Sequence, residues 1–196
     1  MRSERLFAFV DAVIAVIITI MVLDLRPPAR PDFRALAQTA PTFLSYVLSF
    51  VYVAIYWTNH HHFFALVKRV NGADLWANLH LVFWLSLIPF ATAWLGAHPA
   101  GLAPTVVYGA DLLATALAWR LMQTVIIHHQ GADSALARAI GSDVKGRITP
   151  VIYLTGIALA FVTPIAADAC YVLVALMWLI PDRRIERAVA ASADPS

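Results

Sequence analysis

The chain has 196 residues, of which 61% are hydrophobic and 13% are charged, and its formal net charge is +2 at pH 7. Soluble domains contain about 45–50% apolar and about 25% charged residues, so this composition indicates an integral membrane protein. The small net charge gives no argument for a nucleic-acid partner. A single cysteine, Cys170, excludes an internal disulfide and a cysteine-rich metal site.

The first apolar segment, residues 6–25, contains an aspartate, Asp11. A carboxylate in hydrocarbon is costly unless it is paired or hydrated, so such residues usually mark an ion or substrate path. The alternative is an aspartate that lies at the interface and faces lipid headgroups. Because residues 6–10 are already apolar, the sequence favours a functional position within the span.

Six segments approach the length of about 20 apolar residues that crosses a bilayer. Proline, glycine and polar residues separate them, notably Pro27-Pro28, Asn71-Gly72 and the polar loop 128–147. The sequence therefore predicts an all-α, polytopic membrane protein with one transmembrane domain, residues 1–196, and a disordered tail at 188–196. The predicted spans are 6–25, 38–65, 74–97, 103–127, 148–165 and 167–181.

The lysines and arginines predict the orientation of these spans. With six spans, the side of the N-terminus carries ten of the fourteen basic residues, and three lie on the opposite side. The positive-inside rule then places both termini in the cytoplasm of a protein of the cell membrane. The ten are Arg2, Arg5, Lys68, Arg69, Arg138, Lys145, Arg147, Arg183, Arg184 and Arg187, and the three are Arg26, Arg30 and Arg34.

This topology brings polar residues of the first three spans to one depth. Asp11 lies near the cytoplasmic end of the first span, and Trp57, His60 and His61 lie near the same end of the second. Asn78 follows near the start of the third. Trp57 shares a helix face with both histidines, at i+3 and i+4. We expect the partners of Asp11 to come from the neighbouring helices, with the histidines or Asn78 in reach.

The cluster allows a structural polar contact, a proton relay or a metal site. The consecutive histidines 60–62 fan over about 200° on a helix, so at most two of them face one centre. No H-E-x-x-H pattern occurs and cysteine ligands are absent, which disfavours metal or haem. We expect no resident metal or cofactor. His128 and His129 are expected to be solvated, and Arg120 is expected to snorkel or to meet another helix.

A stripe of residues follows Asp11 on the first span. The residues Ala12, Val16, Thr19 or Ile20, and Leu23 recur at i, i+4, i+7 or i+8, and i+11 along one helix face. Within a single subunit such a stripe usually packs in the core. If several subunits met around an axis, the stripe would form stacked rings, which can close a pore by dewetting and offer hydroxyls to an ion.

These residues resemble a known family, the bacterial relatives of the lysosomal transmembrane-protein-175 potassium channel. The first span matches its R-x-x-x-F-x-D and A-x-x-x-T-x-x-x-L patterns, the second its W-x-x-H-H ending, and the third an early asparagine and a later Pro-Phe. The matching residues are Arg5, Phe9, Asp11, Ala15, Thr19, Leu23, Trp57, His60, His61, Asn78, Pro89 and Phe90.

The resemblance implies a potassium-permeable cation channel, not an enzyme, formed as a tetramer of six-helix subunits. The first span would line the pore, with Val16, Thr19 and Leu23 as constriction and filter rings and with modest preference for K⁺ over Na⁺. No T-V-G-Y-G filter occurs in the sequence. The network implied near the cytoplasmic mouth comprises Arg5, Phe9, Asp11, Trp57, His60, His61 and Asn78.

Two residues depart from the family pattern, Val10 and Val16, the latter being smaller than the Ile or Leu expected at the constriction. Val10 stands where the family usually has serine, so a hydroxyl is lost beside Asp11. A proton-coupled secondary transporter that uses Asp11 and the histidines as a relay is the alternative function. Transporters often contain internal repeats, and no repeat relates the first three spans to the last three, which favours the channel.

Overall fold

The computed structural model describes residues 3–180 apart from 68, 132 and 142, and this part of the chain contains only helices and connecting turns. The predicted tail at 188–196 lies outside the described residues. The helices are α1 (Ser3–Leu23), α2 (Phe33–Gln38), α3 (Ala40–Ala65), α4 (Gly72–Leu85), α5 (Ile88–Ala97), α6 (Leu102–Gln130), α7 (Ala135–Ile140), α8 (Val144–Ala160) and α9 (Pro164–Leu179).

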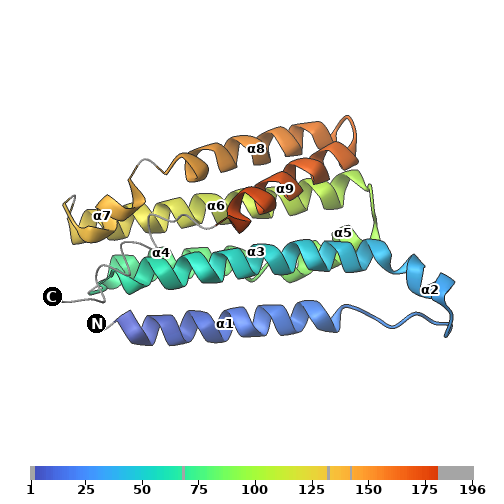
Figure 1. The fold of residues 1–196 in the computed structure, drawn as a ribbon, viewed down its shortest axis with the longest axis horizontal. Helices are drawn as coiled ribbons and strands as arrows, with labels where there is room; N and C mark the ends of the chain where they lie inside the picture. Colours follow the sequence, from blue (N-terminus) through green and yellow to red (C-terminus); the bar gives the residue numbers. More distant parts are fainter. Residues whose placement is uncertain (1–2, 68, 132, 142, 181–196) are drawn as a thin grey trace.

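The long helices lie side by side, and the chain runs along the bundle in alternating directions (Figure 1). The start of α1, the α3–α4 junction and α7 lie at one end of the bundle. The α5–α6 connection, α2 and the α8–α9 turn lie at the other. Four helical segments are long and apolar enough to cross a membrane: Arg5–Leu23, Ala40–Ala65, Gly72–Ala97 and Leu102–Gln130. Helices α8 and α9 are shorter, with 17 and 16 residues, so the six-span count stays a prediction.

The third predicted span, 74–97, is two helices rather than one. It starts earlier, because Asn71 caps α4 in a capping box with Asp74, and the helix ends at Leu85. Pro89 occupies the first turn of α5. Proline lacks an N–H and its ring clashes with the carbonyl four residues earlier, which here belongs to Leu85. The chain therefore breaks at residues 86–87 and resumes as a helix toward Ala97.

The predicted polar loop, 128–147, also contains regular structure. Helix α6 continues to Gln130, and α7 follows with Ser134 as its N-cap. Helix α8 already begins at Val144, where the Asp143 side chain accepts a hydrogen bond from the Gly146 N–H. These short capped segments lack the long apolar period that reveals a span in the sequence.

Two apolar cores hold the bundle together. One joins α1 to α3, α4 and α6, and the other joins α3, α5 and α6 to α8 and α9. In the second core, Tyr171 packs directly against Gly109 of α6 and Gly156 of α8, where a Cβ atom would collide with its ring or hydroxyl. Small residues thus allow close approach of three helices. Helix α1 contributes only to the first core, through Leu6, Val10, Ile14, Ile17 and Met21.

Candidate functional site

Asp11 of α1 receives a hydrogen bond from α3. The Trp57 Nε1–H donates to Asp11 Oδ1 over 3.0 Å, and both side chains are exposed. A histidine or Asn78 was expected as the partner of Asp11, and this expectation is wrong. Asp11 lies to one side of the buried face of α1, so its carboxylate meets the outward-facing indole rather than the buried ring of His60.

His60 and Asn78 form a buried polar pair between α3 and α4. His60 Nε2 lies 2.8 Å from Asn78 Oδ1, so the ring donates from Nε2 in this arrangement. The described residues offer no hydrogen-bond partner to Asn78 Nδ2. Burial in an apolar core makes the loss of one member of such a pair costly, because the other then loses its partner away from water.

Phe7 connects this pair to α1. Its ring lies 5.6 Å from the His60 ring and 5.9 Å from the His61 ring, in edge-to-face geometry in both cases. His61 is exposed and also contacts Trp57, with ring centroids 6.1 Å apart. Successive contacts therefore link five predicted site residues through Phe7: Asp11, Trp57, His61, His60 and Asn78.

Arg5 and Phe9 lie apart from this cluster. Phe9 is 46% exposed, and Arg5 is exposed and forms no ion pair within the described ranges. Phe7 was not among the predicted site residues. Its position four residues before Asp11 puts both side chains on neighbouring parts of one helix face, and this spacing could have identified it. Val10, at the family's serine position, is fully buried in the first core.

The stripe on α1 points away from the rest of the helical bundle. Val16 is 55% exposed and Leu23 is 75% exposed, whereas the opposite face of the helix is buried. Thr19 is also exposed, and its hydroxyl donates to the Ala15 carbonyl over 2.7 Å. The threonine proton is thus used within the helix, and the remaining lone pairs of the oxygen are free to accept.

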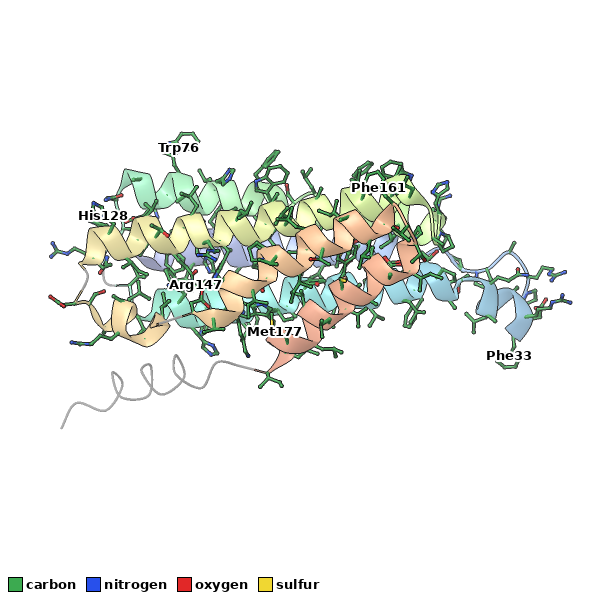
Figure 2. The ribbon with its side chains drawn as sticks, turned by 90° about the horizontal axis from the view of Figure 1, so that it is seen from above. Phe33, Trp76, His128, Arg147, Phe161 and Met177 are labelled. Atoms are coloured by element: carbon green, nitrogen blue, oxygen red, sulfur yellow. The ribbon has the colours of Figure 1, made fainter. Side chains whose placement is uncertain are left out.

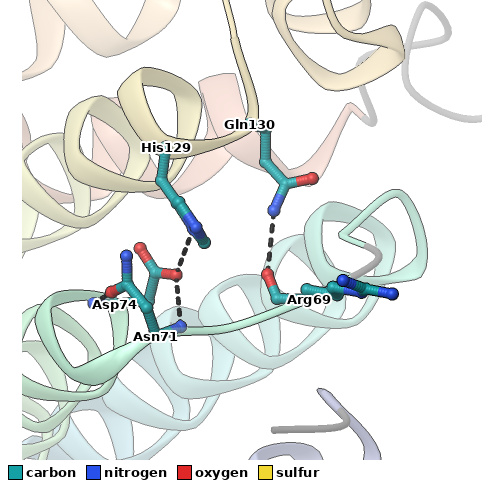
Figure 3. Close-up of polar contacts among 5 residues, drawn as sticks. All are labelled: Arg69, Asn71, Asp74, His129 and Gln130. Carbon is teal, nitrogen blue, oxygen red and sulfur yellow. Dashed lines mark hydrogen bonds and ion pairs between the residues drawn. The ribbon is translucent and has the colours of Figure 1, made fainter.

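A second polar contact joins α4 to α6 at the end of the bundle near the N-terminus. Asp74 is fully buried; its Oδ2 lies 2.8 Å from His129 Nδ1 and accepts the Asn71 N–H over 2.9 Å (Figure 3). The Gln130 amide donates to the Arg69 carbonyl beside it. His128 and His129 are both exposed, as expected. His129 has in addition a partner that was not expected, the buried carboxylate of Asp74 on α4.

These features define a multi-pass, helical membrane protein whose first helix has one exposed face. A protein-family model, "Endosomal/lysosomal potassium channel TMEM175", matches residues 5–89. A potassium channel of Chryseobacterium sp. is 49% identical over 189 residues, which cover 96% of this chain and 98% of that protein. The chain belongs to the TMEM175 potassium-channel family, a family of ion channels and not of enzymes.

A solved structure and a human relative extend the comparison. The crystal structure of a lysosomal potassium-selective channel TMEM175 homolog from Chamaesiphon minutus matches with a TM-score of 0.78 and 27% identity, covering 91% of this chain and 96% of that one. The human endosomal/lysosomal proton channel TMEM175 is 33% identical over 85 residues, which are 37% of this chain and 17% of the human protein.

Proposed function

We propose that the protein is a potassium-permeable cation channel whose pore is lined by α1 of several subunits. The observation that carries this proposal is the exposed stripe of Val16, Thr19 and Leu23 on a helix whose opposite face is buried. The outward face of a spanning helix meets either lipid or another subunit. Potassium-channel relatives that cover nearly the whole chain favour the second case.

The polar residues of this face also favour a pore axis over lipid. Arg5 precedes Leu23 by 18 residues, which is five full turns at 3.6 residues per turn, so it shares the stripe face at the mouth. Thr19 lies between two aliphatic positions on that face. Charged and polar side chains in spans usually face a bundle interior or a water-filled cavity.

Stacked copies of the stripe account for a channel with modest selectivity. The Val16 and Leu23 side chains of several subunits form a narrow aliphatic neck. Ions cannot pass this neck when it contains no water. The Thr19 oxygens can accept contacts from a partly dehydrated cation, because their protons are donated to the Ala15 carbonyls. K⁺ sheds water more cheaply than Na⁺, so the neck favours K⁺. The proposed assembly is a tetramer, as the family resemblance implies, and light scattering of the purified protein tests this number.

The polar contacts between α1, α3 and α4 set the position of α1 in this proposal. Trp57 ties the Asp11 carboxylate to α3, and Phe7 rests on His60, which is itself bonded to Asn78. These contacts lie toward the N-terminal end of α1, whereas Leu23 lies at its other end. A change at the cluster would therefore tilt α1 and alter the width of the neck.

The proposed location is the cell membrane, with the N-terminus and C-terminus in the cytoplasm. Arg5, Arg69, Arg138, Lys145 and Arg147 belong to elements at one end of the bundle (Figure 1). The connection between α1 and α3 at the other end carries the arginines opposite to them: Arg26, Arg30 and Arg34. This asymmetry is the basis of the positive-inside orientation.

Potassium flux from liposomes reconstituted with the purified protein tests the channel. The wild type should conduct K⁺ down its gradient without a co-ion, and Val16→Ala and Leu23→Ala should raise the flux or weaken the selectivity. Val22→Ala is the matched control, because Val22 is an exposed neighbour of Leu23 that faces about 100° away from it on α1. Equal flux in the stripe variants and the control would contradict a pore along α1.

The same liposomes distinguish the alternative, a proton-coupled transporter. In that case K⁺ movement requires a proton gradient, Asp11→Asn abolishes it, and the stripe variants change nothing. The exposed Asp11 carboxylate beside His61 and Trp57 is the observation that keeps this alternative worth testing.

A further inference from the structure

Arg120 is a cation without a counterion inside the helical bundle. It lies on α6, is half-buried, and donates from Nη1 to the Gly146 carbonyl over 3.0 Å. Among the described residues it forms no ion pair. The acidic residue at the start of α8, Asp143, accepts the Gly146 N–H instead. A partly buried guanidinium with one neutral partner retains donors that match an anion.

A cavity surrounds this guanidinium. It lies between α3, α6, α8 and α9, opens to the outside, and has an internal volume of about 30 Å³. The residues that line it include Asn59, Tyr56, Tyr153 and Thr149, whose Oγ1 accepts the Trp178 indole N–H over 2.9 Å, and apolar side chains line the rest. The part of the cavity beside Arg120, called the head pocket, therefore combines polar side chains with one positive charge.

The cavity lies at the level of a membrane–water interface. Arg120 follows the start of α6 by 18 residues, about 27 Å at 1.5 Å per residue, and Asn59 follows the start of α3 by 19 residues, about 28 Å. The hydrocarbon core is about 30 Å thick, so both reach the headgroup level at the end of the bundle that holds the N-terminus. Trp119 and Trp178 line the cavity, and tryptophan is enriched at membrane–water interfaces.

An apolar groove lies along α3 and α9 beside the cavity. Leucine and valine side chains from both helices line most of it, Asp168 of α9 also lines it, and Leu179 is the chain neighbour of Trp178 in the cavity. On α3 the groove and the cavity share one helical stripe with spacings of four, three, four and four residues: Leu44, Leu48, Val51, Ile55 and Asn59. This stripe is about 22 Å long, which exceeds the roughly 15 Å depth of one leaflet.

The rim adds positive charge on the cytoplasmic side of the proposed topology. Lys145 and Arg147 flank Gly146 at the start of α8, and Lys145 Nζ donates to the Ile180 carbonyl just after α9. Figure 2 shows Arg147 and Met177 on the same side of the bundle. Basic pockets between spanning helices on the cytoplasmic side bind anionic lipid headgroups.

We propose that this cavity and groove bind one anionic phospholipid of the cytoplasmic leaflet. Its phosphate accepts hydrogen bonds from Arg120 and Asn59 in the head pocket. One acyl chain lies against Val51 and Leu48 in the groove. The charge of Arg120, the polar wall and the adjoining apolar groove match the two halves of such a lipid, and none of these residues belongs to the stripe on α1.

Native mass spectrometry of the full-length protein in neutral detergent tests this proposal. Phosphatidylglycerol is titrated against phosphatidylcholine, and bound lipid per subunit is measured. The wild type should retain phosphatidylglycerol preferentially. Arg120→Gln should reduce its affinity about tenfold, the factor that corresponds to about 1.4 kcal/mol, whereas Arg120→Lys should retain part of it. Arg138→Gln, an exposed arginine of α7 at the same end, is the control and should bind as the wild type does.

A groove variant keeps the result interpretable if a charge variant folds poorly. Val51→Trp fills the groove and should reduce retention of both lipids without changing the oligomeric mass. Equal retention of phosphatidylglycerol by the wild type and Arg120→Gln would overturn the proposal. A change in oligomeric mass in Val51→Trp, with lipid binding unaffected, would overturn it as well, because the groove would then be a contact between subunits.

Discussion

The indole N–H of Trp57 on α3 donates to the carboxylate of Asp11 on α1 over 3.0 Å, at an exposed position between the two helices. In the part of the chain that the structure describes, it is the only side-chain hydrogen bond between α1 and another helix. The remaining contacts of α1 are apolar or aromatic. The rotation of α1 about its own axis therefore depends on a small number of directional contacts near its N-terminal half.

A double-mutant cycle should detect this bond. Trp57→Phe and Asp11→Ala each remove it, so their combined effect on the free energy of unfolding should be smaller than the sum, with a coupling of about 0.5–1 kcal/mol for an exposed charge-assisted pair. Denaturation of the purified protein measures it. Trp57→Phe with Asp24→Ala is the control cycle, because Asp24 lies beyond the far end of α1. Additive effects in both cycles would show that the bond contributes nothing.

The buried pair of His60 and Asn78 should matter more for stability. Asn78→Ala leaves His60 Nε2 without its acceptor in an apolar core, and the expected loss is about 1–3 kcal/mol in the free energy of unfolding. Thermal or denaturant unfolding in detergent checks this value. His98→Ala in the exposed connection before α6 should leave stability nearly unchanged. If both variants unfold alike, the pair has no structural role.

Asp74 should be a strong stability determinant outside the proposed pore. Asp74→Ala removes both the partner of His129 and the capping bond to the Asn71 N–H, and the loss of these hydrogen bonds should cost about 1–3 kcal/mol in the free energy of unfolding. Asp74→Asn keeps an acceptor for the cap and should lose less. Asp133→Asn, at an exposed position, is the control. A loss in Asp74→Ala no larger than in the control would contradict this role.

The four long apolar segments were predictable because a long apolar run and the prolines that interrupt the chain act locally. The break in the third span was not predicted, although Pro89 is visible in the sequence, because a proline in an apolar run can also kink a continuous helix. Helices α2 and α7 have six residues each and rest on single side-chain caps, Asp32 and Ser134. Segments this short show no period from which a helix can be identified.

The level of the site residues along the bundle was predictable from the sequence, but which side chains contact each other was not. Antiparallel spans place His60 and Asn78 at the same level, and the structure joins them. Which face of α1 turns toward α3 depends on tertiary packing of Leu6, Val10 and Ile14, which no spacing within α1 reveals. This rotation presents Phe7 to the histidines and turns Phe9 outward. The exposure of the stripe follows from the same rotation, and its role in a pore stays a proposal.

Thr19 provides the sharpest test of the filter chemistry. Thr19→Val keeps the shape of the side chain and removes the oxygen, so the K⁺ flux should fall, because no acceptor replaces lost water. The preference for K⁺ over Na⁺ should persist, because K⁺ still loses water at the lower cost. Thr19→Ser should retain most of the K⁺ flux. Thr155→Val is the matched control, since Thr155 of α8 is also exposed and donates to the carbonyl four residues earlier over 2.9 Å. Ion-substitution flux assays in liposomes measure both the flux and the ratio of the two ions. An unchanged K⁺ flux in Thr19→Val would remove Thr19 from the filter and leave the aliphatic rings alone to select the ion.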